Sequence, residues 1–230
     1  RETKLELVGP SIATSLGRYR LKSFSQRSAL GTRWGLLLLW GENFVTVHDV
    51  SIGAFFLSAT VTITSSSTSF KLTTVYGPTR SNLKDGFFQE LVGEKPPNGD
   101  KWLVNGDFNQ IYRARDKNRA NVNCSRLVRF RKALNSCELK EISLQNRKFT
   151  WSNEQNDPTM SKLDGFFCNE EWDLVFPTHI LQALSSSLSD HCSLLLANAT
   201  GPCYLLSMCW FSLKEERVMQ QSSISNSLSF

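Results

Sequence analysis

The chain has 230 residues, of which 40% are hydrophobic and 20% are charged, and its formal net charge at pH 7 is +5. This length allows one large domain or two small ones, and the composition excludes a disordered chain and a collagen-like fibre. The sequence opens without a signal-peptide pattern, and its apolar runs are too short or too interrupted to cross a bilayer. We therefore expect an intracellular protein without a membrane partner, and the nucleus is a candidate compartment.

Short apolar and β-branched runs, taken in chain order, predict a series of strands. They cover residues 36–40, 44–47, 55–63, 70–75, 102–104, 148–151, 162–167 and 193–196. A run of serines and threonines over residues 64–69 separates two of these strands and predicts a hairpin turn.

Two helices are predicted among the strands. The first covers residues 83–92, and the second carries four apolar residues at helical spacing, which are Leu127, Phe130, Leu134 and Cys137. Many strands with few helices favour an α+β sandwich over a regular βαβ alternation. The pattern decays after residue 198, so we expect one folded domain over 1–198 and an unstructured tail over 199–230.

The six cysteines show no C-x-x-C spacing and no paired histidine. They are Cys124, Cys137, Cys168, Cys192, Cys203 and Cys209. The sequence therefore signals neither a zinc site nor a redox motif, and we expect small buried thiols in a reducing compartment.

A polar triplet follows the predicted strand over residues 102–104, where a packed core would not require one. Strand alternation lets Asp107 and Asn109 face one site while Phe108 points into the core, and Gly106 lets a ligand or backbone come close. The alternative is an Asx-turn in which Asp107 only ties down a loop.

Further polar residues stand at the ends of other predicted strands. Asp164 lies in an apolar strand and needs a partner, because a buried and unpaired carboxylate costs several kcal/mol. His191, next to Asp190, is the natural candidate, although such an Asp-His pair is also typical of a surface salt link. Tyr76 precedes a Gly-Pro turn, and Glu2 lies at the start of the sequence. An acid-rich set with one histidine suits Mg²⁺ and phosphoryl chemistry better than zinc.

The positive charge is concentrated between Arg113 and Lys132, where eight lysines and arginines accompany the single acid Asp116. Such a run is often a solvated helix face, and its alternative is a surface that contacts phosphates. The candidate nucleic-acid contacts are Arg113, Arg115, Lys117, Arg119, Arg126 and Arg129.

Six motifs in order resemble the endonuclease/exonuclease/phosphatase superfamily, and within it the apurinic-like endonuclease domain of plant LINE-type non-LTR retrotransposons. They are "ETK", "VYGP", "NGDFN", "TWSN", "KLD" and "SDHCSLLL", and they extend from Glu2 to Leu196. The resemblance implies an α+β, four-layer sandwich in which two mixed β-sheets pack face to face with helices outside. It also implies a domain truncated before its first strand, and a degraded linker over 199–230.

The resemblance also implies the role of each site residue. Glu2 and Asp190 would hold Mg²⁺, or Mn²⁺ in its place, and no small-molecule cofactor is implied. Asp107 would orient or deprotonate the attacking water, and Asn109 and Tyr76 would contact the phosphate. His191 would stabilise charge on the phosphate, and Asp164 would fix the tautomer of His191.

The sequence thus predicts a Mg²⁺-dependent phosphodiesterase, a DNA endonuclease domain of retrotransposon origin that nicks one strand by attack of water. One alternative is a truncated and inactive relic that at most binds nucleic acid. Another is a phosphatase of small molecules on the same fold, because a fold does not fix the substrate.

Overall fold

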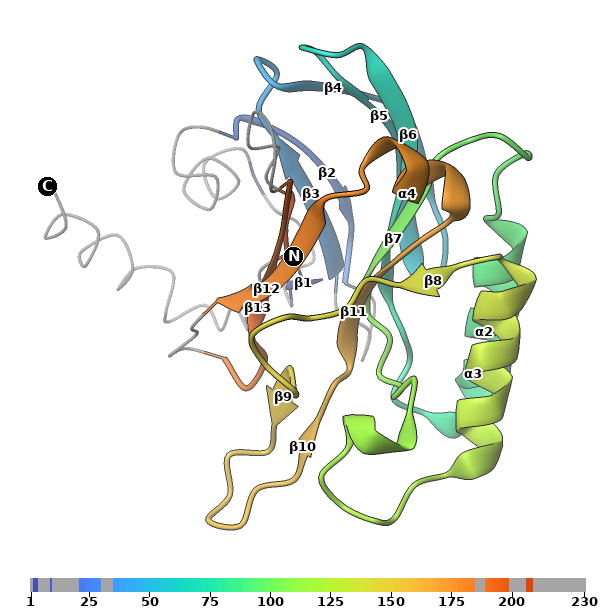
Figure 1. Cartoon of the computed structure of the whole chain (residues 1–230), viewed down its shortest axis with the longest axis vertical. Coiled ribbons are helices and arrows are strands. Elements are labelled where there is room, and N and C mark those ends of the chain that lie inside the picture. Colours follow the sequence, from blue (N-terminus) through green and yellow to red (C-terminus); the bar gives the residue numbers. More distant parts are fainter. Residues whose placement is uncertain are drawn as a thin grey trace, which may run out of the picture.

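The computed structural model describes residues 2–3, 9, 21–29, 35–184, 189–198 and 206–208. The largest sheet has six strands in the order β4-β5-β6-β7-β11-β8 (Figure 1). Its strands are β4 (Val45–Ile52), β5 (Phe56–Ile63), β6 (Thr68–Tyr76), β7 (Trp102–Asp107), β11 (Asp164–Cys168) and β8 (Lys140–Glu141). Because β6 and β7 are parallel and the other neighbours are antiparallel, the sheet is mixed.

Smaller sheets lie beside it. One has the order β1-β3-β2, another β12-β13-β14, and a two-stranded ribbon pairs β10 with β9. Their bounds are β1 (Glu2–Thr3), β2 (Ser23–Arg27), β3 (Gly35–Trp40), β9 (Trp151–Ser152), β10 (Met160–Ser161), β12 (His179–Leu184), β13 (Ser193–Asn198) and β14 (Leu206–Met208).

Two helices, α2 (Lys84–Gly93) and α3 (Cys124–Ser136), cover one face of the six-stranded sheet (Figure 1). The stripe predicted for the second helix is buried, and the side chain of Asn123 caps its start by accepting a hydrogen bond from the Arg126 amide at 3.0 Å. A shorter helix, α4 (Glu170–Val175), follows β11 and leads toward β12. None of the described helices is both long and apolar enough to span a membrane.

The six-stranded sheet separates two hydrophobic cores. One core lies against α2 and α3 and includes Trp102, Phe108 and Phe130. The other lies against the smaller sheets and joins Leu103 and Phe166 to residues of β12 and β13. The two faces of β7 therefore belong to different cores, which explains why all six of its residues are buried.

This arrangement confirms the predicted α+β sandwich, with two layers of strands and helices outside. The hairpin over residues 64–69 is confirmed, because β5 and β6 pair in register on both sides of the turn. A helical layer on the far side of the smaller sheets is not among the described residues. The domain boundary at residue 198 stays a prediction, and β14 pairs with β13 beyond it.

Some local predictions differ from the structure. The strand predicted over 148–151 is reduced to Trp151–Ser152, which pairs with the two residues of β10. Cys137, Cys168 and Cys192 are buried as expected, whereas Cys124 is exposed. Cys203 and Cys209 lie outside the described residues.

A glycine fixes the end of β7, and its replacement tests that constraint. Gly106 has φ +149°, and a Cβ there would lie 2.0 Å from the Val75 carbonyl oxygen. We expect Gly106→Ala to lower the free energy of unfolding by about 2 kcal/mol or more, as measured by urea denaturation.

Gly86→Ala is the matched control, because Gly86 lies exposed in α2 and a Cβ there meets nothing within 4 Å. It should raise the free energy of unfolding by about 0.5–1 kcal/mol. Equal stabilities for the two variants would contradict the role given to Gly106.

Candidate active site

The ends of three neighbouring strands bring the predicted site residues together. In the parallel pair β6 and β7, Tyr76 stands opposite Asp107, and in the antiparallel pair β7 and β11, Asp107 stands opposite Asp164. The pairing register therefore brings these three polar residues together.

Close backbone contacts fix the loop that follows β7. The Gly77 amide donates to the Asp107 carbonyl at 2.7 Å, and a Cβ on Gly77 would lie 2.2 Å from the Phe108 carbonyl oxygen. Phe108 itself is 1% exposed and packs edge-to-face on Phe167. The core thus anchors the loop between Asp107 and Asn109, as the alternation predicted.

His191 is the hydrogen-bond partner of Asp164, as expected. Its Nδ1 lies 2.9 Å from Oδ2 and 3.1 Å from Oδ1 of Asp164, which is 1% exposed. A carboxylate can only accept, so Nδ1 carries the proton of this bond. The Thr150 hydroxyl accepts from the amides of Leu163 and Asp164 at 3.0 and 3.1 Å, which fixes the start of β11.

Asn109 orients Asp107 in this structure. The Asn109 amide donates to Oδ1 of Asp107 at 2.6 Å, and its side-chain Nδ2 donates to Oδ2 at 2.7 Å and to the Gly77 carbonyl at 2.9 Å. The Asx-turn considered as an alternative is therefore present, with Asn109 at φ +47°. The two Nδ2 hydrogens are committed to these bonds, so the contact of Asn109 with a phosphate stays a prediction.

Lys84 is a residue of this region that the sequence reasoning missed. It is 3% exposed, and its Nζ donates to the Asn109 carbonyl at 2.7 Å and to the Phe108 carbonyl at 3.2 Å. A signal was present, because Lys84 precedes Phe87, Phe88 and Leu91 by three, four and seven positions on the buried face of α2. A lysine on that stripe needs a polar partner in the interior.

The buried charges shift one another's pKa values. Burial raises the pKa of the Asp107 carboxyl, and the Asp164 carboxylate raises it further. Burial alone lowers the pKa of His191, but the charge and hydrogen bond of Asp164 outweigh it and raise the pKa to about 9. Burial lowers the pKa of Lys84 to about 8, although the charge of Asp107 opposes this. The site is a compact group of mutually dependent charges.

The remaining predicted residues lie around this centre. Asp190 is exposed, and its Oδ2 accepts a hydrogen bond from Trp151 Nε1 at 2.9 Å. Tyr76 is at the end of β6 with its backbone amide bonded to the Phe55 carbonyl. For Glu2 the structure gives the backbone pairing with Leu36 in β3, and its side chain lies outside the described part.

The donor set fits a divalent cation. Ligand atoms of Asp107, Asp164 and His191 all lie within 4.8 Å of one another, and Asp190 adds a carboxylate next to His191. A site with more carboxylate oxygens than imidazole nitrogens suits a hard ion better than zinc.

Several basic residues of the 113–132 run have local partners. Arg113 pairs with Glu141 at 2.7 Å, Arg119 with Asp157 at 2.6 Å, and Arg129 with Asp85 at 2.9 Å. Arg126 donates to Ser81, and Arg115 is exposed. Arg129 therefore helps to hold α3 against α2, in addition to any contact with nucleic acid.

Two basic residues inside the run line an open polar cavity. This cavity has a volume of about 850 Å³, and Lys117, Arg119, Asn121 and Gln155 are among its lining residues. Lys117 Nζ donates to the Asn121 side chain at 2.7 Å, so its charge has a neutral partner.

Known proteins with this fold process nucleic acids or phosphate esters. The endonuclease domain of TRAS1, a telomere-specific non-LTR retrotransposon, is 13% identical, with a TM-score of 0.59 over 78% of this chain and 81% of that domain. The TDP2 of D. rerio in complex with a single-strand DNA product is 15% identical, with a TM-score of 0.53 over 81% and 80%.

A third structure has a different activity. The mannosyl-6-phosphatase of Bacteroides thetaiotaomicron VPI-5482 is 9% identical, with a TM-score of 0.50 over 85% of this chain and 97% of that chain. No protein-family model and no curated protein matches the sequence. The similarity shows that this chain shares the fold of these proteins, while the activity has to be argued from the site.

The Asp164–His191 pair gives a direct spectroscopic prediction. In Asp164→Asn, the imidazole loses its charged partner while burial remains, so the pKa of His191 should fall from about 9 toward 6.5. Titration of the histidine ring signals by NMR measures this shift.

The His48 signal is the internal control, because His48 lies in β4 at the opposite edge of the sheet, and it should be the same in both proteins. An unchanged His191 midpoint would contradict the pairing with Asp164.

Proposed function

We propose that this protein is a metal-dependent phosphodiesterase that nicks one strand of DNA. The observation that carries the proposal is the convergence of Asp107, Asn109, Asp164 and His191 at the ends of β7, β11 and β13. A phosphodiester repels nucleophiles, so its hydrolysis needs a base for water and positive charge beside the phosphate. This group of side chains has both.

Asp107 is the base in this proposal. Its two carboxylate oxygens are fixed by Asn109, and burial raises its pKa, so the carboxylate is a better proton acceptor near neutral pH than an exposed aspartate. Lys84 donates to the carbonyls of Phe108 and Asn109, which directly follow Asp107, and so helps to keep Asp107 in place.

His191 stabilises the phosphate. With Nδ1 committed to Asp164, Nε2 is the ring atom that would donate to a phosphate oxygen. The raised pKa keeps the imidazole protonated at neutral pH, so the donor is a cation. Glu2 and Asp190 are the proposed Mg²⁺ ligands, and Mn²⁺ is the alternative ion. When bound, the ion would supply further positive charge that stabilises the phosphate in the transition state.

DNA is the proposed substrate. Lys117 and Arg119 line an open polar cavity, Arg113 and Arg115 lie just before them in the sequence, and Arg126 and Arg129 lie in α3. Lysines and arginines that contact phosphates supply most of the sequence-independent affinity for DNA. A retroelement of the LINE type is the proposed origin, supported by the six motifs together with the TRAS1 fold.

Plasmid nicking tests the catalytic assignment. With Mg²⁺, the wild-type chain should convert supercoiled plasmid to the open circle, and Asp107→Asn should lower the rate about a hundredfold or more, because the variant lacks the base. Agarose-gel assays at equal protein concentration measure both rates.

Asp49→Asn is the matched control, because Asp49 is an exposed residue of β4 whose φ of +51° an asparagine also adopts. It should nick at the wild-type rate. A folded wild-type chain that nicks no faster than Asp107→Asn with either ion would instead favour the inactive relic.

Salt dependence separates DNA from small phosphate esters as substrates. Raising the salt from about 50 to about 200 mM should slow nicking at subsaturating DNA steeply, because the counterions released on DNA binding set the affinity. Binding of p-nitrophenyl phosphate releases no such layer of counterions, so its hydrolysis should slow much less as salt is added. Lys117→Ala should lower the slope of log affinity against log salt by about one, which fluorescence anisotropy measures.

The control is Lys95→Ala, which makes the same charge change outside the basic run, where Lys95 pairs with Glu138 at 2.9 Å. It should leave the slope unchanged. Hydrolysis of the small ester with no effect on DNA would favour the phosphatase.

A further inference from the structure

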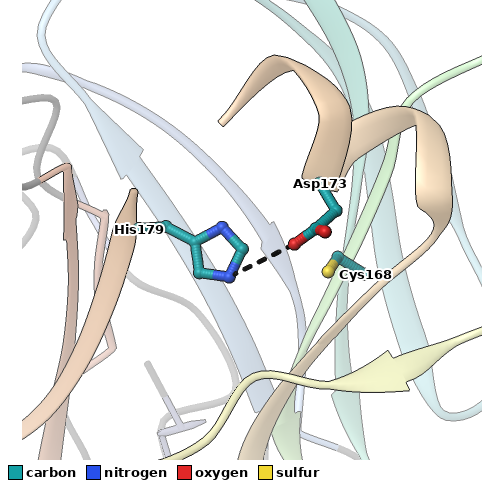
Figure 2. Close-up of side chains that lie close together, drawn as sticks. All are labelled: Cys168, Asp173 and His179. Atoms are coloured by element: carbon teal, nitrogen blue, oxygen red, sulfur yellow. Dashed lines mark ion pairs between the residues drawn. The ribbon is translucent and has the colours of Figure 1, made fainter. Parts of the chain in front are cut away.

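A second group of metal-ligand side chains lies away from the active site. Cys168 is the last residue of β11, Asp173 lies in α4, and His179 begins β12 (Figure 2). One ligand atom of each residue lies within 4.8 Å of those of the other two. Figure 2 shows the three side chains pointing toward one another from three different elements.

The histidine is held as a metal ligand would be. Its Nδ1 lies 2.6 Å from the Phe176 carbonyl oxygen, and a carbonyl only accepts, so Nδ1 carries a proton. In the neutral ring Nε2 therefore has the lone pair, and it faces Asp173. A backbone carbonyl that fixes the tautomer in this way is typical of metal-binding histidines.

The spacing of the ligand atoms is that of two groups around one ion. His179 Nε2 lies 3.8 Å from Asp173 Oδ1, which is too long for a hydrogen bond. Two ligands at tetrahedral angles around Zn²⁺ lie about 3.4 Å apart. A protonated Nε2 would make this contact an ion pair, whereas a neutral Nε2, whose lone pair faces the carboxylate, requires a cation between the two atoms.

The two oxygens of Asp173 have separate partners. Oδ2 pairs with Lys140 Nζ, while Oδ1 faces His179. Lys140 stands opposite Cys168 in the β8–β11 pair, and about half of its side chain is exposed. The ion pair with Lys140 therefore orients the carboxylate and leaves Oδ1 for an ion.

A cavity lies beside His179. His179 and Trp172 line a mainly apolar cavity of about 280 Å³ between the six-stranded sheet and the strands β3 and β13. Trp172 is 4% exposed, and its Nε1 has no hydrogen-bond partner within the described part of the chain. A buried donor without an acceptor is costly, so the residue next to Asp173 has an unmet hydrogen bond among the described residues.

We infer that Cys168, Asp173 and His179 form a second metal site, for a thiolate-binding divalent ion such as Zn²⁺. On binding, the Cys168 thiol releases its proton to solvent and the sulfur forms the bond to the metal. One thiolate, one carboxylate and one neutral imidazole balance the charge of the ion, which suits a largely buried site. A sulfur ligand disfavours Mg²⁺ and Ca²⁺.

A metal ion bound at this site would stabilise the fold. The three residues belong to β11 of the large sheet, to β12 of a smaller sheet and to the helix between them. A bound ion would join both layers of strands, so it would stabilise the folded chain by binding it and not the unfolded one. This inference does not rest on the proposed nuclease activity.

Cobalt substitution tests the site. We expect one equivalent of Co²⁺, added to the reduced chain, to produce a thiolate-to-metal charge-transfer band, and Zn²⁺ to remove the band by displacement. Cys168→Ser should abolish it. Cys137→Ser is the matched control, because Cys137 is a buried thiol of the other core, and it should keep the band. Asp107→Asn should keep it as well, because the active site has no sulfur.

Two further variants cover the case in which Cys168→Ser does not fold. Asp173→Asn and His179→Gln change side chains that are 34% and 13% exposed, and each should weaken Co²⁺ binding at least about tenfold. Zn²⁺ should raise the Tm of the wild-type chain and shift that of either variant less. A folded, reduced chain without the band, or a band that survives in Cys168→Ser, would overturn the inference.

Discussion

The structure depends on two aspartates that stand opposite each other in the interior. Asp107 and Asp164 are direct partners in the β7–β11 pair, and both are almost fully buried. Two carboxylates this close cannot both ionise without nearby positive charge. His191, just before β13, and Lys84 in α2 supply it, so the burial of the carboxylate pair depends on how these elements pack. The packing of the second sheet and of the outer helices is thereby coupled to the chemistry of the site.

Much of the fold could be predicted from the sequence, because the central strands are long and apolar. The boundaries predicted for β5 and β6 are close to those observed, whereas β7 starts where predicted but continues three residues further, to Asp107. Ser23–Arg27 was missed because it is a polar strand, recognisable only by its pairing with β3. β12 was missed although its buried positions alternate, because the six residues follow a turn and carry one histidine and one glutamine. Two-residue strands such as Lys140–Glu141 have no periodicity to detect.

The site was predictable to the extent that its residues break the pattern of a core. Asp107, Asn109 and Asp164 interrupt or end apolar strands, so their sequence context alone marked them. Lys84 and Thr150 act through contacts with segments 24 and 13 or more positions away, and the sequence does not report such contacts. The same limit applies to Arg129, whose partner Asp85 is 44 positions away. The three residues proposed to bind a thiolate-seeking ion have no characteristic spacing, because three separate elements supply them.

The loop that holds Asp107 is fixed by backbone atoms. Gly77 and Gly106 bring main-chain groups of the neighbouring strand and loop into contact, at distances that no other residue would allow. The side chains of Phe108, Asn109 and Lys84 hold the same loop, so contacts within the loop and beneath it set the position of the carboxylate. Residues that contact substrate on the surrounding surface can be substituted without moving the Asp107 carboxylate. Such substitutions would change only which substrate is bound. A scaffold of this kind allows its specificity to diverge quickly while the reaction it performs stays the same.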